Sequence, residues 1–314
     1  SERVLILGDN GAGKTNILEA ISLLTPGRGM RGSKLDEICA HNASSFEVAA
    51  IVNGALGPSR LNISFQRSAA KRLVEFNNSK ITSTELANIA SVVWLTPQME
   101  WLFLGASSDR RRYFDRVIYA FDPAHAARIN KYEYYLKERI KILDLPNIDY
   151  NWLLVIEGKL SEMALEIIQK RVEVIEVLQK TLDNLVSPFP KARIEITPDY
   201  RDKDLDWMKE QFADSRADDI RSGRSNFGPH RVDFVVYYDA KNIEARFCST
   251  GEQKAMLISL TIAQVIALQD YSNAFPILLL DEIFVHLDDM RRDYLAAFLS
   301  SRSSQCLITS TEDD

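Results

Sequence analysis

Cysteine is scarce in this sequence, and no apolar run is long enough to cross a lipid bilayer. An odd number of cysteines without metal-ligand spacing argues against a disulfide framework and fits a reducing compartment. A signal-peptide pattern is also missing. We therefore expect a cytoplasmic protein with no membrane partner. The cysteines are Cys39, Cys248 and Cys306.

An excess of positive charge is missing as well. The chain has 38 Lys and Arg against 44 Asp and Glu, so its formal net charge is -6. Because phosphates are bound by local Lys and Arg, this total neither favours nor excludes a nucleic-acid partner. Apolar residues are plentiful, at 46% of 314 residues, which is enough to bury a core in one large or two ordinary domains.

A glycine-rich segment near the start matches the G-x-x-x-x-G-K-[ST] pattern of phosphate-binding loops. It follows a predicted buried strand (3–7) and precedes a predicted amphipathic helix (16–24). Glycines let backbone N–H groups surround a polyphosphate, Lys14 reaches the β- and γ-phosphates, and the Thr15 hydroxyl binds Mg²⁺. The predicted nucleotide contacts are Gly8, Asp9, Asn10, Gly11, Ala12, Gly13, Lys14, Thr15 and Asn16. Because strands of this kind usually have earlier neighbours, we expect the natural chain to begin before this sequence does.

A second chemical motif lies near the other end of the chain, where the apolar run 276–280 ends in Asp281 and Glu282. Such a continuous run is typical of a parallel strand buried on both faces. In P-loop enzymes the first acid holds Mg²⁺ and the second accepts a proton from the attacking water. We assign Asp281 to the metal and Glu282 to the general base; the alternative is a pair of exposed acids at a strand end.

Two long helical patterns occupy the middle of the chain, with apolar residues spaced by three and four and an interruption at Arg171. The break at 144–147 predicts an antiparallel pair over about 124–187. The pair is either a packed core element or a protruding arm that contacts a partner.

The order of the motifs resembles that of the ABC-type ATPases. It runs from the P-loop through Gln98 and a serine-glycine segment at the start of an apolar helix to Asp281-Glu282 and Leu287-Asp288. Within these ATPases the chain is similar to the SMC-related recombination proteins of the bacterial RecF family. The stretches that carry the resemblance are residues 8–16, Asp109-Arg110-Arg111-Arg112-Tyr113-Phe114-Asp115, Gly228-Pro229-His230-Arg231 and Ser249-Thr250-Gly251-Glu252-Gln253-Lys254.

The resemblance implies an α/β fold, a P-loop ABC-type ATPase head with a mixed β sheet and an inserted helical lobe. Residues 1–90 and 276–314 would form the nucleotide-binding lobe I. Residues 91–275 would form lobe II, which carries the short antiparallel helix pair (about 124–187) and the serine-glycine signature.

The resemblance also implies a composite ATP site shared by two copies. Ser249 and Gly251 would close over the γ-phosphate held by a second protomer, and Asp288 would belong to the same site. Gln98 occupies the place of a residue that contacts the attacking water or Mg²⁺, where RecF proteins often carry Glu. The catalytic residues would be Glu282 and Gln98, and the metal residues Thr15, Asp281 and Gln98.

The implied function is that of an ATP-dependent DNA-binding protein of recombination, repair and the SOS response to DNA damage. ATP would drive homodimerisation, and slow, DNA-stimulated hydrolysis would reverse it. The protein would bind single-stranded DNA and gapped or junction duplexes, and would help RecR, with RecO, to load RecA at single-strand gaps and stalled replication forks.

Alternative functions are a transporter ATPase subunit, another SMC-like repair ATPase, and a small-molecule or guanine-nucleotide P-loop enzyme. The strand 305–310 is not followed by the switch histidine of transporter ATPases, and an N-K-x-D base-recognition motif is missing. DNA-stimulated ATP turnover would separate a repair protein from the transporter and small-molecule classes.

Two further groups of residues have open interpretations. The basic residues are expected either to touch DNA phosphate, to form a solvated face, or, for Arg110 to Arg112, to pair with the lobe that carries Asp281. Gly228 to Arg231 is interpreted as a structural turn or as a nucleotide- or interface-sensing element. The basic set is Arg110, Arg111, Arg112, Arg128, Lys131, Lys137, Arg139 and Lys141.

Overall fold

The computed structural model describes residues 3–311, apart from 55–56, 273–274 and 303. The chain divides into two compact units. Unit 1 comprises Ser1–Glu100, Leu185–Pro190 and Ser249–Asp314, and unit 2 comprises Trp101–Asn184 and Lys191–Cys248. Among the described helices, none combines the length and the apolar character needed to cross a membrane.

The central sheet of unit 1 is parallel, with the strand order β1-β11-β10-β6. Its middle strands are apolar runs buried on both faces, as parallel strands covered by helices require. The register places Asp281 of β10 beside Thr309 of β11, and Ser310 beside Leu7. The strands are β1 (Arg3–Leu7), β6 (Val92–Leu95), β10 (Ile277–Asp281) and β11 (Cys306–Ser310).

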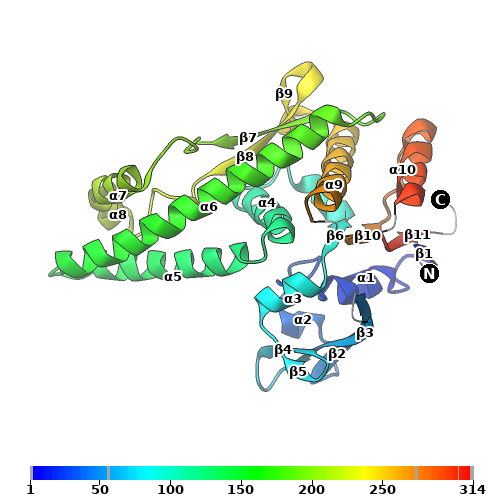
Figure 1. The fold of residues 1–314 in the computed structure, drawn as a ribbon, viewed down its shortest axis with the longest axis horizontal. Coiled ribbons are helices and arrows are strands. Elements are labelled where there is room, and N and C mark those ends of the chain that lie inside the picture. The colour runs from blue at the N-terminus through cyan, green and yellow to red at the C-terminus, as the bar shows by residue number, and fades with distance from the viewer. Residues whose placement is uncertain (1–2, 55–56, 273–274, 303, 312–314) are drawn as a thin grey trace. The chain divides into compact units, whose positions relative to one another are not determined.

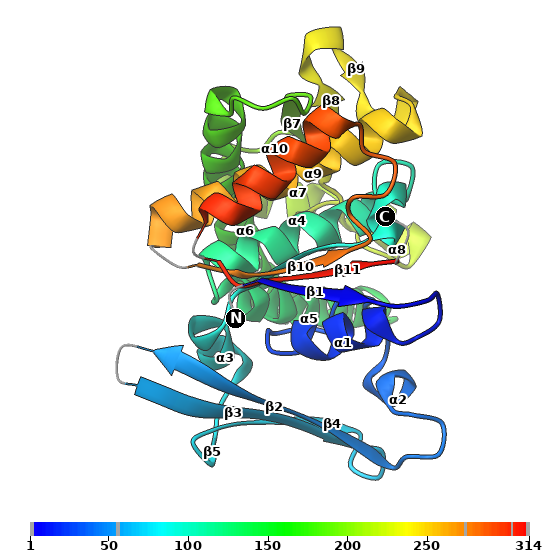
Figure 2. The ribbon, with the colours of Figure 1, turned by 90° about the vertical axis from the view of Figure 1, so that its right-hand side faces the viewer.

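Helices cover both faces of this sheet (Figure 2). Alternate strand residues point to opposite faces, so Leu279 packs with Leu18 of α1, whereas Leu280 shares an apolar cavity with Ile258 of α9 and Phe298 of α10. The three helices are α1 (Lys14–Ser22), α9 (Thr250–Ser272) and α10 (Asp289–Ser301).

A second, antiparallel sheet of unit 1 has the order β2-β3-β4-β5 and buries Leu61, Ile63 and Val74. The predicted α/β class is confirmed, but the expected single mixed sheet is divided into a parallel and an antiparallel sheet. Short connections join antiparallel neighbours, whereas the strands of a parallel sheet need longer crossover connections. The elements are α2 (Leu35–Ile38), β2 (Ser45–Gly54), β3 (Gly57–Gln66), β4 (Lys71–Phe76), β5 (Ser79–Lys80) and α3 (Ser83–Ile89).

The compact units differ from the expected lobes, which placed 91–275 together. β6 pairs with β10 in the central sheet, and α9 packs against β6, so residues 91–100 and 249–275 belong to unit 1. The serine-glycine segment thus lies in the same unit as the P-loop.

Unit 2 contains the predicted helix pair, in which α5 and α6 run side by side (Figure 1). Their seam buries Tyr132 of α5 against Leu160, Ala164 and Ile167 of α6. A three-stranded sheet with the order β7-β8-β9 completes the unit. Its elements are α4 (Ser107–Phe121), α5 (His125–Leu143), α6 (Tyr150–Asn184), β7 (Ala192–Thr197), α7 (Leu205–Asp214), α8 (Arg216–Ser222), β8 (Asp233–Tyr238) and β9 (Ile243–Glu244).

Arg171 interrupts the apolar seam of α6 because it is the centre of a buried ion cluster. It donates from Nε (2.9 Å) and Nη2 (2.7 Å) to the two carboxylate oxygens of Asp115, and from Nη1 to the Pro229 carbonyl (2.6 Å). His125 Nε2 donates to the same carboxylate (3.1 Å). Burial raises the pKa of Asp115, but the charge of Arg171 and the hydrogen bonds from His125 and Arg171 outweigh burial and hold this pKa below its usual value.

The Gly228 to Arg231 segment ties the chain before β8 to the helix pair. Gly228 has φ 126°, and a Cβ there would lie 2.3 Å from Tyr132 Oη. His230 Nε2 donates to the Ser225 carbonyl (3.1 Å), so Nδ1 of the neutral ring is an acceptor. The Tyr132 hydroxyl donates to this Nδ1 (2.7 Å). Arg231 also donates to the Ser225 carbonyl. These contacts support the structural interpretation of the motif.

His230 is expected to make the protein less stable in mild acid. Burial lowers its pKa to about 4, so between about pH 6.5 and pH 4 the unfolded chain binds a proton that the folded chain does not. The free energy of unfolding should therefore fall by about 2 kcal/mol between pH 7 and pH 5 through this residue. Urea unfolding at both pH values measures the loss, and His230→Gln should reduce it while His41→Gln, at an exposed histidine, should not. An unchanged pH dependence in His230→Gln would contradict the assignment.

Candidate nucleotide-binding site

The P-loop joins β1 to α1 through glycines with positive φ. Gly11 has φ 86° and Gly13, the N-cap of α1, has φ 93°, values that residues with a Cβ rarely adopt. Lys14 is buried, and its ammonium donates to the carbonyls of Gly8 and Asp9. Backbone donors at a helix N-terminus together with a buried ammonium form an anion site suited to a polyphosphate.

The structure brings the two ends of the chain together at Asp281. Its carboxylate accepts hydrogen bonds from the Thr15 hydroxyl (3.1 Å to Oδ2) and from the Thr309 hydroxyl (2.7 Å to Oδ1). Asp281 is only 5% exposed. The Thr15 and Asp281 oxygens fit Mg²⁺, which prefers few protein oxygens and completes its shell with phosphate and water.

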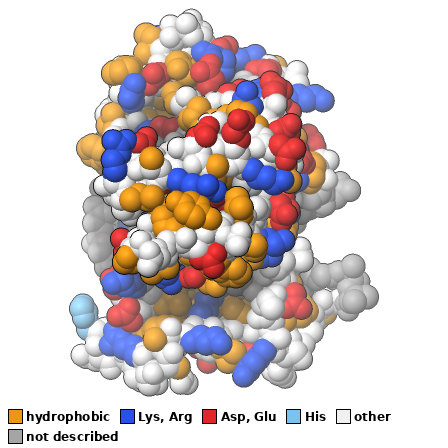
Figure 3. All heavy atoms as spheres, turned by 90° about the vertical axis from the view of Figure 1, so that its left-hand side faces the viewer, with side chains coloured by type: hydrophobic (Ala, Val, Ile, Leu, Met, Phe, Trp, Pro, Cys, Tyr) orange, Lys and Arg blue, Asp and Glu red, His pale blue; other side chains and the backbone are white. Residues whose placement is uncertain are grey.

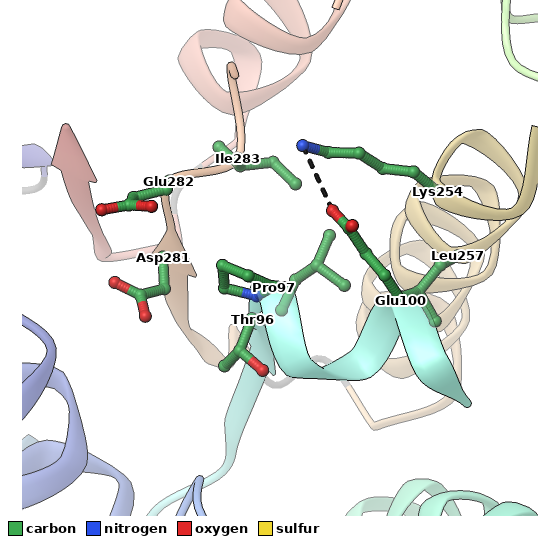
Figure 4. Close-up of a pocket in the computed structure, with 9 residues that line it drawn as sticks. Thr96, Pro97, Glu100, Lys254, Leu257, Asp281, Glu282 and Ile283 are labelled. Carbon is green, nitrogen blue, oxygen red and sulfur yellow. Dashed lines mark ion pairs between the residues drawn. The ribbon is translucent and has the colours of Figure 1, made fainter. Parts of the chain in front are cut away.

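Glu282 follows Asp281 at the end of β10 and has φ 51°, a strained value for a residue with a side chain. Its N–H donates to the Thr309 hydroxyl (3.1 Å) and to the Thr309 carbonyl (3.3 Å), which hold this conformation. Asp281 and Glu282 line one side of a pocket, and Glu100 and Lys254 line the other (Figure 4). Glu282 thus remains the candidate for the group that accepts a proton from water.

Gln98 and Glu100 both lie on the short helix η1 (Pro97–Trp101), but they differ in placement. Gln98 is exposed and is not among the residues that line the pocket, whereas Glu100 is. Glu100 Oε1 lies 3.4 Å from Lys254 Nζ. The sequence pattern predicted Gln98 as a site residue and missed Glu100. The one available signal for Glu100 was its position two residues after Gln98, on the same turn.

Ser249 and Gly251 are exposed at the start of α9. The Glu252 carboxylate accepts from the N–H and the hydroxyl of Ser249, both at 2.9 Å, and Glu252 N–H donates back to that hydroxyl. This capping box fixes the first turn of α9. Asp288 caps α10 in a similar way, since its carboxylate accepts from Arg291 N–H (2.9 Å).

Known proteins are similar in sequence to this chain over nearly its whole length. The DNA replication and repair protein RecF of Rickettsia akari (strain Hartford) is 44% identical over 315 residues, which cover 98% of this chain and 88% of that protein. Residues 1–314 match the family described as RecF/RecN/SMC N terminal domain. The chain belongs to the RecF family. The resemblance to the RecF family that the sequence motifs predicted is thus confirmed.

Solved structures agree with this membership. A structure of the recombination mediator protein RecF with ATP in the RecFOR pathway has a TM-score of 0.89 and 25% identity, with 99% of this chain and 86% of that chain covered. The Smc head domain of Pyrococcus furiosus has a TM-score of 0.52 at 18% identity, covering 100% of this chain and 84% of that one, and shows the shared fold alone.

The basic residues of this RecF-family chain are mostly engaged within unit 2. Arg110 pairs with Asp233 (2.6 Å) and Arg111 donates to the Val232 carbonyl (2.9 Å), so their partners belong to unit 2 and not to the lobe that carries Asp281. Arg112 pairs with Asp109 (2.5 Å).

Arg139 is the largest departure from expectation. It is 0% exposed and donates to Glu157 (2.9 Å) and Asp219 (2.5 Å), so it cannot contact DNA phosphate as the sequence suggested. Arg128 and Lys141 pair with acidic neighbours, whereas Lys131 and Lys137 are exposed. Figure 3 shows Lys and Arg side chains interspersed with Asp and Glu on one face of the molecule, as expected of a solvated surface.

Proposed function

We propose that this chain is an ATP-dependent DNA-binding ATPase of DNA replication, recombination and repair. The observation that carries the proposal is the 3.1 Å contact between Thr15 of the P-loop and Asp281 at the end of β10. At this contact a hydroxyl of the P-loop meets a carboxylate from the opposite end of the sequence. Nucleotide hydrolysis by P-loop proteins uses both groups at the Mg²⁺ site. The names of the RecF relatives and the ATP-bound RecF structure support the same function.

In the proposed mechanism the P-loop N–H groups and Lys14 hold the phosphates, and Thr15 and Asp281 hold Mg²⁺. Mg²⁺ would neutralise charge that develops on the phosphate oxygens. Glu282 accepts the proton of the attacking water, and its backbone contacts with Thr309 keep its position. Gln98 contributes from η1, beside Pro97 of the pocket wall.

The proposed site is completed by a second copy of the chain. Ser249 and Gly251 are exposed at the start of a long helix, where a γ-phosphate on another protomer could reach them. The Ser249 N–H and hydroxyl, which donate to the Glu252 carboxylate in this structure, would turn to that phosphate. Asp288 lies in the loop before α10 and belongs to the same proposed interface. ATP would thus join two protomers, and weak hydrolysis would release them.

The proposed partners are single-stranded and gapped or junction DNA, RecR, and through RecR also RecO and RecA. A solved RecF neighbour is described as a recombination mediator in the RecFOR pathway, which supports this placement. The protein would act in the cytoplasm, at single-strand gaps and stalled forks. Lys131 and Lys137, exposed on α5, are the proposed phosphate contacts of the helix pair.

We expect gapped DNA to raise ATP turnover of the unmodified protein severalfold. The double variant Lys131→Glu, Lys137→Glu should need more DNA for the same stimulation, and the slope of log affinity against log salt should fall by about 1 to 2. Turnover with a DNA titration at several salt concentrations measures both effects. ATP turnover that does not change when DNA is added would contradict the repair function. An unchanged salt slope would mean that α5 does not contact DNA.

A further inference from the structure

Lys254 lies across the pocket from Asp281 and Glu282 at the end of β10. The proposed mechanism gives it no role. Lys254 stands in the first turns of α9, and its side chain is only 13% exposed. Together with Glu100 of η1 it lines the pocket that also contains Asp281 and Glu282 (Figure 4). Three separate segments of unit 1 therefore meet around one ammonium group.

The contacts of Lys254 reach the backbone that follows the general base. Its Nζ donates to the Val285 carbonyl (2.6 Å) and lies 3.4 Å from Glu100 Oε1. Because an ammonium group only donates hydrogen bonds, Lys254 Nζ is held between two acceptors, the Val285 carbonyl and the Glu100 carboxylate. Lys254 thus links η1, α9 and the segment after β10.

The segment held in this way is strained at both ends. Glu282 has φ 51° and His286 has φ 62°, and residues with side chains keep such values only where the surroundings enforce them. Thr309 fixes the Glu282 end through its hydroxyl and carbonyl. The Val285 carbonyl, one residue before His286, is fixed by Lys254.

We propose that Lys254 is a positioning residue for hydrolysis, which holds the backbone of 282–286 so that the Glu282 carboxylate keeps its orientation toward water. Glu100 orients Lys254 by the ion pair. Lys254 acts through Glu282 and does not touch the nucleotide. This inference rests on the proposed role of Glu282 as general base.

The test compares Lys254→Met, Lys254→Arg and the control Lys209→Met, at an exposed lysine of unit 2 that pairs with Asp206. We expect Lys254→Met to lower kcat about 10- to 100-fold, since a small displacement of a catalytic group has effects of this size. Affinity for a fluorescent ATP analogue should change less than twofold. Lys254→Arg should restore most of kcat, and Lys209→Met should match the unmodified protein. Loss of nucleotide affinity equal to the loss of kcat, or no rescue by Arg, would overturn the proposal.

A second measurement does not depend on activity. Hydrogen exchange of the nucleotide-free protein should be faster for the amides of 283–288 in Lys254→Met than in Lys209→Met, with melting temperatures recorded to confirm folding. Unchanged exchange in this segment would overturn the anchoring role even if no variant hydrolysed ATP. Turnover that persists in Glu282→Gln would instead overturn the proposed role of Glu282 as general base, so the two failures are distinguishable.

Discussion

Glu282→Gln is expected to lower ATP turnover by about 10²- to 10⁴-fold, the usual contribution of a general base, while ATP binding persists. The amide keeps the shape of the side chain but cannot accept a proton from water at neutral pH. Thr15, Asp281 and Lys14, which hold metal and phosphate in the proposed mechanism, are unchanged. The variant should therefore accumulate in the ATP-bound state.

Solution mass and turnover together measure this result. With Mg-ATP the Glu282→Gln variant should be a dimer, and with Mg-ADP a monomer, because Ser249 and Gly251 would close only over a γ-phosphate. Glu47→Gln, an acid-to-amide change at an exposed residue of β2, is the matched control and should behave like the unmodified protein. A monomer in both nucleotides would argue against the composite site, and unimpaired turnover would argue against Glu282 as the base.

Arg139→Met is expected to destabilise the protein by about 3 to 5 kcal/mol, the range found when one partner of a buried ion pair is removed. Arg139 donates to Glu157, Asp219 and the Phe212 carbonyl, and both acids are at most 3% exposed. Methionine would fill much of the volume but leave the Asp219 charge without its guanidinium partner. Arg216 still contacts Glu157, so that acid keeps one ion pair.

Urea unfolding followed by circular dichroism measures the destabilisation of Arg139→Met. Lys137→Met lies two residues earlier on the exposed side of α5 and should change the free energy of unfolding by less than about 0.5 kcal/mol. A change below about 1 kcal/mol in Arg139→Met would mean that the cluster relaxes or admits water. Any loss of DNA binding by an Arg139 variant should parallel its loss of folded protein.

The residues of the candidate nucleotide site could be proposed from the sequence because each motif depends on local sequence. Glycines at positive φ, a lysine at the helix start and two acids after an apolar strand each require only the backbone of their own segment. The register of parallel strands then brought Thr15 and Asp281 together. Family membership followed from the same motifs, and the helix pair from its apolar spacing.

The partners of the long charged side chains were decided only by the tertiary structure. Arg139 and Arg171 lie on long helices, and both are buried because acids from distant segments, Asp219 and Asp115, neutralise them. Glu100, and not Gln98, faces the pocket because the η1 turn rotates neighbouring residues to different sides. Spacing determines which face of an element a residue occupies, but packing of distant elements determines what that face meets.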